Sequence, residues 1–68
     1  MPTALLTGAA SGIGRATATA LVDAGWDVYA TDVDTDGLDE LAARGCRTAH
    51  VDVTDRSSID AVVDRITA

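Results

Sequence analysis

The 68-residue chain contains no lysine and almost no aromatic side chains. With one tryptophan, one tyrosine and no phenylalanine, a hydrophobic core must be built from Ala, Val, Leu and Ile. Five arginines face eleven acids, which gives a formal net charge of −6. A chain this acidic, without a basic cluster, is not expected to bind nucleic acid or a membrane surface.

Other common features are also missing. Cys46 is the only cysteine, so no internal disulfide is possible, which fits a reducing compartment. No apolar run approaches the roughly 20 residues of a membrane-spanning helix. The N-terminal segment lacks the positive region and the apolar length of a secretory signal. We therefore expect a cytoplasmic protein.

Along the chain, stretches with the apolar spacing of strands alternate with stretches that have the apolar spacing of helices. This predicts the order β-α-β-α-β-α. The strands are expected at residues 3–7, 26–32 and 47–51. The run at 3–7 is apolar without alternation, which predicts burial on both faces. Helices are expected from Ile13 to a stop at Gly25, over 36–45 with Asp34 or Thr35 as the cap and Gly45 as the stop, and after a Thr54 cap.

Alternating elements with short connections predict an α/β fold with a parallel sheet and right-handed crossovers. We expect a Rossmann-like, three-layer half of a doubly wound sheet, with strand order 3-2-1. In the complete doubly wound order, the first strand pairs with a fourth. Here that strand would be an open edge, which predicts pairing with another chain and a homo-oligomer, most simply a two-fold dimer.

A glycine-rich loop, "TGAASGIG" at residues 7–14, joins the first strand to the first helix. Gly8 would let the chain turn sharply, Gly12 would let a diphosphate approach the backbone, and Gly14 would let the helix pack closely. The helix N-terminus favours an anion, and Ser11 can add a hydroxyl. A Walker-type loop is excluded because it needs a lysine. The alternative is an ordinary strand–helix turn.

Asp32 lies 18 residues after Gly14, at the end of the second predicted strand. An acid at about this distance hydrogen-bonds the adenosine ribose hydroxyls of a dinucleotide. Its charge would repel a 2′-phosphate, so Asp32 favours NAD over NADP. The segment "DVDTDG" at 32–37 also matches the start of a calcium loop, but position 12 is Ala43 in place of glutamate and no helix precedes it. We therefore predict no metal site.

The pattern T-G-x-x-x-G-I-G resembles the coenzyme fingerprint of the short-chain dehydrogenase/reductase family. The continuation through residue 32 and "DVTD" at 52–55 are also similar to that family, so the resemblance covers nearly the whole chain. It implies an oxidoreductase that uses NAD, with Asp52 accepting from the adenine amine and Val53 lining the adenine pocket. The predicted cofactor-binding residues are Gly8, Ser11, Gly12, Ile13, Gly14, Asp32, Asp52 and Val53.

Members of that family catalyse hydride transfer with a Tyr-x-x-x-Lys pair, a serine and usually an asparagine. Tyr29 is followed at the lysine position by Val33, so no catalytic residue is assigned. We interpret residues 1–68 as a single, partial dinucleotide-binding domain. The predicted function is the NAD-binding N-terminal portion of an oxidoreductase, a fragment or truncated product without catalysis of its own. The alternatives are a stand-alone nucleotide-binding module and a self-assembling module without enzymatic role.

Overall fold

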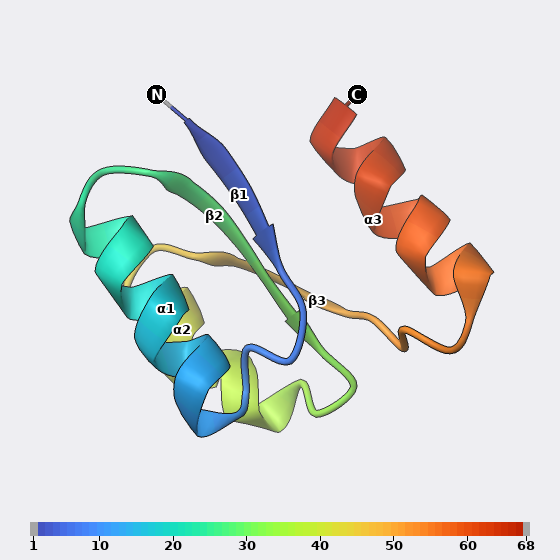
Figure 1. Cartoon of the computed structure of the whole chain (residues 1–68), viewed down its shortest axis with the longest axis horizontal. Coiled ribbons are helices and arrows are strands. Elements are labelled where there is room, and N and C mark those ends of the chain that lie inside the picture. Colours follow the sequence, from blue (N-terminus) through green and yellow to red (C-terminus); the bar gives the residue numbers. More distant parts are fainter. Residues whose placement is uncertain (1, 68) are drawn as a thin grey trace.

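The chain runs through alternating strands and helices, as its sequence pattern predicts (Figure 1). The computed structural model describes residues 2–67. Its elements are β1 (Thr3–Leu6), α1 (Gly12–Asp23), β2 (Asp27–Asp32), the 3₁₀ helix η1 (Asp36–Leu38), α2 (Asp39–Ala43), β3 (Arg47–His50) and α3 (Arg56–Thr67). No helix between residues 2 and 67 has the length and apolar character needed to cross a membrane.

The three strands form one parallel sheet in the order β1-β2-β3, which is the predicted 3-2-1 order counted from the other edge. Thr3 pairs with Asp27 in one ladder, and Tyr29 pairs with Arg47 in the other. Helices α1 and α2 lie on one side of the sheet and α3 lies on the opposite side (Figure 1). The predicted α/β, Rossmann-like, three-layer half of a doubly wound fold is therefore confirmed.

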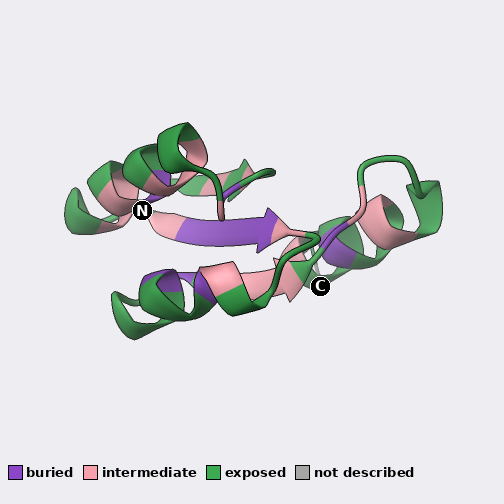
Figure 2. Ribbon diagram, turned by 90° about the horizontal axis from the view of Figure 1, so that it is seen from below, coloured by how far each residue is buried: buried purple, intermediate pink, exposed green. Residues whose placement is uncertain are grey.

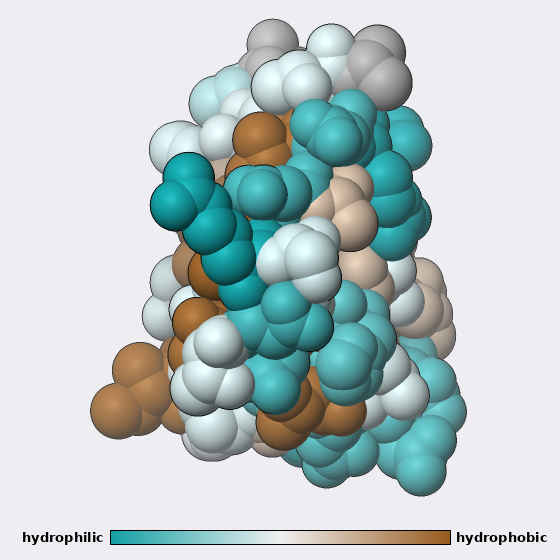
Figure 3. Space-filling view, turned by 90° about the vertical axis from the view of Figure 1, so that its right-hand side faces the viewer, coloured by the Kyte–Doolittle hydropathy of each residue, from teal (hydrophilic) through white to brown (hydrophobic). Residues whose placement is uncertain are grey.

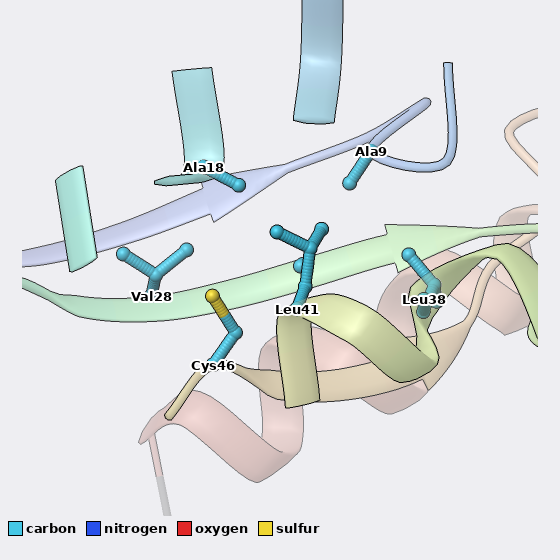
Figure 4. Close-up of a cluster of buried hydrophobic side chains, with 7 residues drawn as sticks. Ala9, Ala18, Val28, Leu38, Leu41 and Cys46 are labelled. Atoms are coloured by element: carbon cyan, nitrogen blue, oxygen red, sulfur yellow. The ribbon is translucent and has the colours of Figure 1, made fainter. Parts of the chain in front are cut away.

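The main hydrophobic core lies between the sheet and the α1–α2 layer. Figure 4 shows Val28 of β2 and Leu41 of α2 with their side chains in this space. The buried cluster consists of small and medium aliphatic side chains with one thiol: Ala9, Ala18, Val28, Ala30, Leu38, Leu41 and Cys46. Burial raises the pKa of the Cys46 thiol. The scarcity of aromatic residues is thus met by short side chains that let the layers approach closely.

Burial differs sharply between the first two strands. The middle strand β2 is buried along most of its length (Figure 2), including its Tyr29 and Thr31. In β1, exposed and half-buried residues alternate, and Leu5 remains 38% exposed. The prediction that β1 is buried on both faces was wrong, because β1 is an edge strand in the described part of the chain.

Helix ends agree with the sequence at their C-termini more closely than at their N-termini. Gly25 and Gly45 have positive φ angles of 92° and 109° directly after the caps of α1 and α2, as predicted. The expected helix over 36–45 is split into η1 and α2. Thr54 does not cap α3: the Oδ1 of Asp55 accepts the N–H of Ser57 at 3.0 Å, so Asp55 is the cap.

Candidate functional site

Three loops meet at the carboxyl edge of the sheet, because parallel strands all end on the same side. The loop after β1 reaches Asp32, which is the last residue of β2. The backbone N–H of Ala10 donates to the Oδ2 of Asp32 at 3.0 Å. The N–H of Val51, directly after β3, donates to the Asp32 carbonyl at 3.1 Å. The fold therefore brings the glycine loop and Asp32 together, with Asp52 and Val53 following β3.

Two glycines of the loop are required by its own geometry. Gly8 has a φ of 66°, a left-handed conformation that side chains other than glycine's rarely adopt. A Cβ placed on Gly14 would collide with the carbonyl oxygen of Gly8. Ser11 also ties the loop, since its hydroxyl donates to that same carbonyl at 2.7 Å. The first turn of α1 can therefore lie directly against the loop only with glycine at position 14.

The backbone N–H groups of residues 9–14 divide into two sets. Those of Ala9, Ala10 and Ser11 donate to Thr31, Asp32 and Gly8 respectively. Those of Gly12, Ile13 and Gly14, in the first turn of α1, have no acceptor within residues 2–67. These donors lie at the positive end of the helix dipole, where an anionic group is favoured.

The surface around these donors is open. A Cβ on Gly12 would meet no atom within 4 Å, and Ile13 is 85% exposed. Residues 2–67 enclose no pocket here. Val33 and Val53 are also exposed aliphatic side chains, and they follow β2 and β3 at the same edge. Sequence reasoning missed Val33, although an apolar residue directly after Asp32, inside an acidic turn, was a usable signal.

The Asp32 carboxylate is held by backbone donors on both of its oxygens. The N–H of Asp34 donates to Oδ1 at 3.0 Å, while Ala10 donates to Oδ2. These bonds, that from Asp34 above all, hold the pKa of Asp32 below its ordinary value. An ionised carboxylate offers about four lone-pair positions, so two remain for further donors such as a pair of hydroxyls.

Asp52 is fixed in a similar way by the turn that follows it. Its Oδ1 accepts both the hydroxyl of Thr54, at 2.6 Å, and the Thr54 N–H, at 2.9 Å. The hydroxyl bond is the main reason that the pKa of Asp52 is lowered. Its other oxygen, Oδ2, has no partner within the described residues. Asp52 can therefore accept further donors at Oδ2.

In the acidic segment 32–37, two carboxylates accept hydrogen bonds from backbone N–H groups of the same segment. Asp32 accepts from Asp34, and the Oδ1 of Asp34 in turn accepts the N–H of Gly37 at 3.2 Å. In the part of the chain that the structure describes, no group of three or more His, Cys, Asp or Glu side chains is placed to hold a metal ion. These contacts give Asp32 and Asp34 a role in shaping the turn.

Sequence comparisons match nearly the whole chain. The sequence matches the short chain dehydrogenase family over residues 2–68. It is 44% identical over 71 residues to D-threitol dehydrogenase of Mycolicibacterium smegmatis, covering 96% of this chain and 27% of that protein. It is 46% identical over 61 residues to 2-keto-3-deoxy-L-fuconate dehydrogenase of Xanthomonas campestris, covering 87% of this chain and 20% of that protein. The chain thus spans about a quarter of these relatives' length.

Solved structures give the same result for the fold. A short-chain dehydrogenase from Streptomyces avermitilis superposes with a TM-score of 0.88 at 41% identity, over 96% of this chain and 25% of that one. Levodione reductase superposes with a TM-score of 0.82 at 32% identity, over 94% of this chain and 28% of that one. Taken with the match over residues 2–68, these likenesses show that the chain belongs to the short-chain dehydrogenase/reductase family.

Proposed function

We propose that this chain is the NAD-binding N-terminal portion of a short-chain oxidoreductase and has no catalysis of its own. The observation that carries the proposal is the set of unpaired N–H donors of Gly12, Ile13 and Gly14, which begin α1 at the sheet edge where Asp32 ends β2. Donors for a diphosphate and an acceptor for the neighbouring ribose thus lie on two loops that are hydrogen-bonded to each other.

The residues present fit an adenine dinucleotide part by part. The three α1 amides would hold the diphosphate, and Asp32 would accept two ribose hydroxyls. Asp52 would accept the adenine amine through its unoccupied oxygen, with Val33 and Val53 beside the ring. The nicotinamide of NAD supplies a hydride acceptor when bound, but the Tyr-x-x-x-Lys pair that serves this chemistry in the family is not part of the sequence.

The charge around Asp32 favours NAD over NADP. A 2′-phosphate needs a nearby arginine, whereas a carboxylate repels it. Arg15 is the arginine nearest in sequence to the loop, and its guanidinium already contacts Glu40 at 3.6 Å and the Ala10 carbonyl at 3.4 Å. Arg15 is therefore engaged by Glu40 and Ala10 and is not set to neutralise a phosphate at Asp32.

Titration calorimetry with NAD, ADP-ribose and NADP tests the proposal. NAD and ADP-ribose should bind with similar affinity and NADP more weakly. Asp32→Ala should lose at least about 100-fold in NAD affinity, because two hydrogen bonds to a charged group, each of about 1.5–3 kcal/mol, disappear. Asp36→Ala, on the same turn but without a side-chain hydrogen bond, is the matched control. Equal indifference to all three ligands, or an NAD preference that survives Asp32→Ala, would refute the assignment.

A second candidate role is self-association through β1. This strand has a neighbour on only one side within residues 2–67, and its Leu5 is 38% exposed. Figure 3 shows the side of the molecule on which α3 lies, where hydrophobic side chains interrupt a hydrophilic surface. We propose a homo-oligomer paired through this edge, in the cytoplasm, where the thiol of Cys46 would stay reduced.

Light scattering at micromolar concentrations distinguishes this role from simple ligand binding. The wild-type chain should scatter as a dimer or larger species, and Leu5→Lys should scatter as a monomer, because a charge on an edge strand opposes pairing. A wild-type chain that is monomeric throughout would remove this candidate without affecting the nucleotide site.

A further inference from the structure

The peptide group of Ala10 is held from both ends by side chains of other segments. Its N–H donates to the Oδ2 of Asp32 at 3.0 Å, and its carbonyl accepts from the Nη2 of Arg15 at 3.4 Å. The Nη1 of Arg15 also lies 3.6 Å from a carboxylate oxygen of Glu40 on α2. The middle of the glycine loop is thus fastened to the end of β2 and, through Arg15, to α2.

A steric contact supports the loop from the same direction. A Cβ added to Gly37 would lie 2.7 Å from the Cβ of Ala10, so the turn and the loop are in close contact. Gly37 is itself placed by the Asp34 carboxylate, and the N–H of Asp34 is bonded to Asp32. Residues 32–37 therefore form a hydrogen-bonded unit that contacts Ala10 by one polar and one van der Waals contact.

We propose that Asp32 is a positioning residue for the diphosphate site, in addition to its contact with ribose. By fixing Ala10, it keeps the start of α1 oriented so that the Gly12, Ile13 and Gly14 amides face a ligand. This inference rests on the proposed nucleotide site. A loop released from Asp32 would populate the binding geometry for only part of the time, and the apparent affinity falls by that fraction.

A ligand without ribose hydroxyls separates the two roles of Asp32. ADP and 2′,3′-dideoxy-ADP are titrated into wild-type chain, Asp32→Asn and Asp36→Asn. The asparagine variant keeps one carbonyl acceptor but presents an NH₂ group to one of the two backbone donors, so its side chain can no longer hold Ala10 and Asp34 together. Asp36→Asn removes the same charge from an exposed neighbour and measures the electrostatic effect alone.

Asp32→Asn should weaken dideoxy-ADP about five- to tenfold relative to Asp36→Asn, although this ligand offers Asp32 no hydroxyl. If only ADP is weakened, Asp32 acts through the ribose alone and the inference is overturned, while the nucleotide site stands. If the wild-type chain binds neither ligand, the proposed function fails, and the test below still decides the role of Asp32 in the loop.

Amide hydrogen exchange in the ligand-free chain reports on the same contact directly. The Ala10 amide should be protected in the wild type and in Asp36→Ala, and should exchange at least several-fold faster in Asp32→Ala, which removes both acceptor oxygens, relative to β2 amides as an internal control for global stability. An Ala10 amide that exchanges equally fast in all three chains would overturn the inference. Gly37→Ala gives an independent variant, which should weaken ADP and dideoxy-ADP by the same factor because residue 37 offers the ribose no side-chain acceptor.

Discussion

Gly12 and Gly14 are two residues apart in the first turn of α1, yet replacing each with alanine should have opposite effects on stability. Alanine is favoured over glycine in a helix by up to about 1 kcal/mol. At Gly12 nothing lies within 4 Å of the added Cβ, so Gly12→Ala should keep or slightly raise the free energy of unfolding. At Gly14 the Cβ would collide with the Gly8 carbonyl oxygen and approach the Cα of Ala9 to 3.0 Å.

The Gly14 contact is with backbone atoms, which cannot rotate away as a side chain can. Overpacking of this kind costs about 1–3 kcal/mol, which exceeds the helix-propensity gain. Gly14→Ala should therefore be about 2 kcal/mol less stable than Gly12→Ala. Urea unfolding followed by circular dichroism measures the difference, and the two variants share composition and charge and both change the first turn of α1.

Ligand affinity should show that the two glycines serve different purposes. Gly12→Ala should remain folded but bind ADP at least tenfold more weakly, because its methyl group would occupy the open face next to the free amides. Equal stability of the two variants would show that α1 does not lie against the loop as the structure has it. Unchanged ADP affinity in Gly12→Ala would show that the diphosphate does not approach that face.

Two further predictions concern Thr31 and the acids of the site. The hydroxyl of buried Thr31 donates to the Leu6 carbonyl at 2.6 Å, so Thr31→Val should lose about 1–2 kcal/mol of unfolding free energy in urea titrations. As the control, Thr17→Val removes an exposed hydroxyl that donates to the Ile13 carbonyl at 3.0 Å. It should change the free energy of unfolding by less than about 0.5 kcal/mol. The lowered pKa of Asp32 means that its stabilisation is complete above its ordinary value of 3.8 and is lost as pH falls below it. The free energy of unfolding and the affinity for NAD, measured from pH 6 to pH 3, should both fall below about pH 3.8 in the wild type and fall less in Asp32→Ala. An equal pH dependence in the two chains would contradict this.

The order of elements was predictable because short-range patterns determine it. Helical spacing of apolar residues, the glycine stops at 25 and 45, and the aliphatic strand runs each reflect local geometry. The burial of β1 was not predictable from its own residues, because an apolar run reads the same at an edge as in the middle of a sheet. Only the neighbours of a strand decide that, and β1 has one in the described chain.

The cap of α3 shows a second limit of local reading. Thr54 and Asp55 are both good capping residues, and sequence preference does not separate them. The Thr54 hydroxyl is instead used by Asp52 at 2.6 Å, which leaves Asp55 to accept from the helix. The hydrogen bond from Thr54 to Asp52, after the end of β3, therefore leaves Asp55 as the cap of α3. The same bond holds Asp52 in place.

In the glycine loop, too, hydrogen bonds to a distant segment decide which groups remain available. Read from the sequence, all of its amides between Thr7 and Arg15 are equivalent candidates for holding a diphosphate. In the structure, the Ala9 and Ala10 amides are bonded to the end of β2 and the Ser11 amide to Gly8, so that among residues 9–14 the donors of the first α1 turn remain. The loop is therefore fixed before any ligand arrives, so binding need not order it, which lowers the entropic cost of association. If Asp32 binds the ribose as proposed, the same acid also fixes the loop, and affinity for the two halves of a nucleotide should rise and fall together.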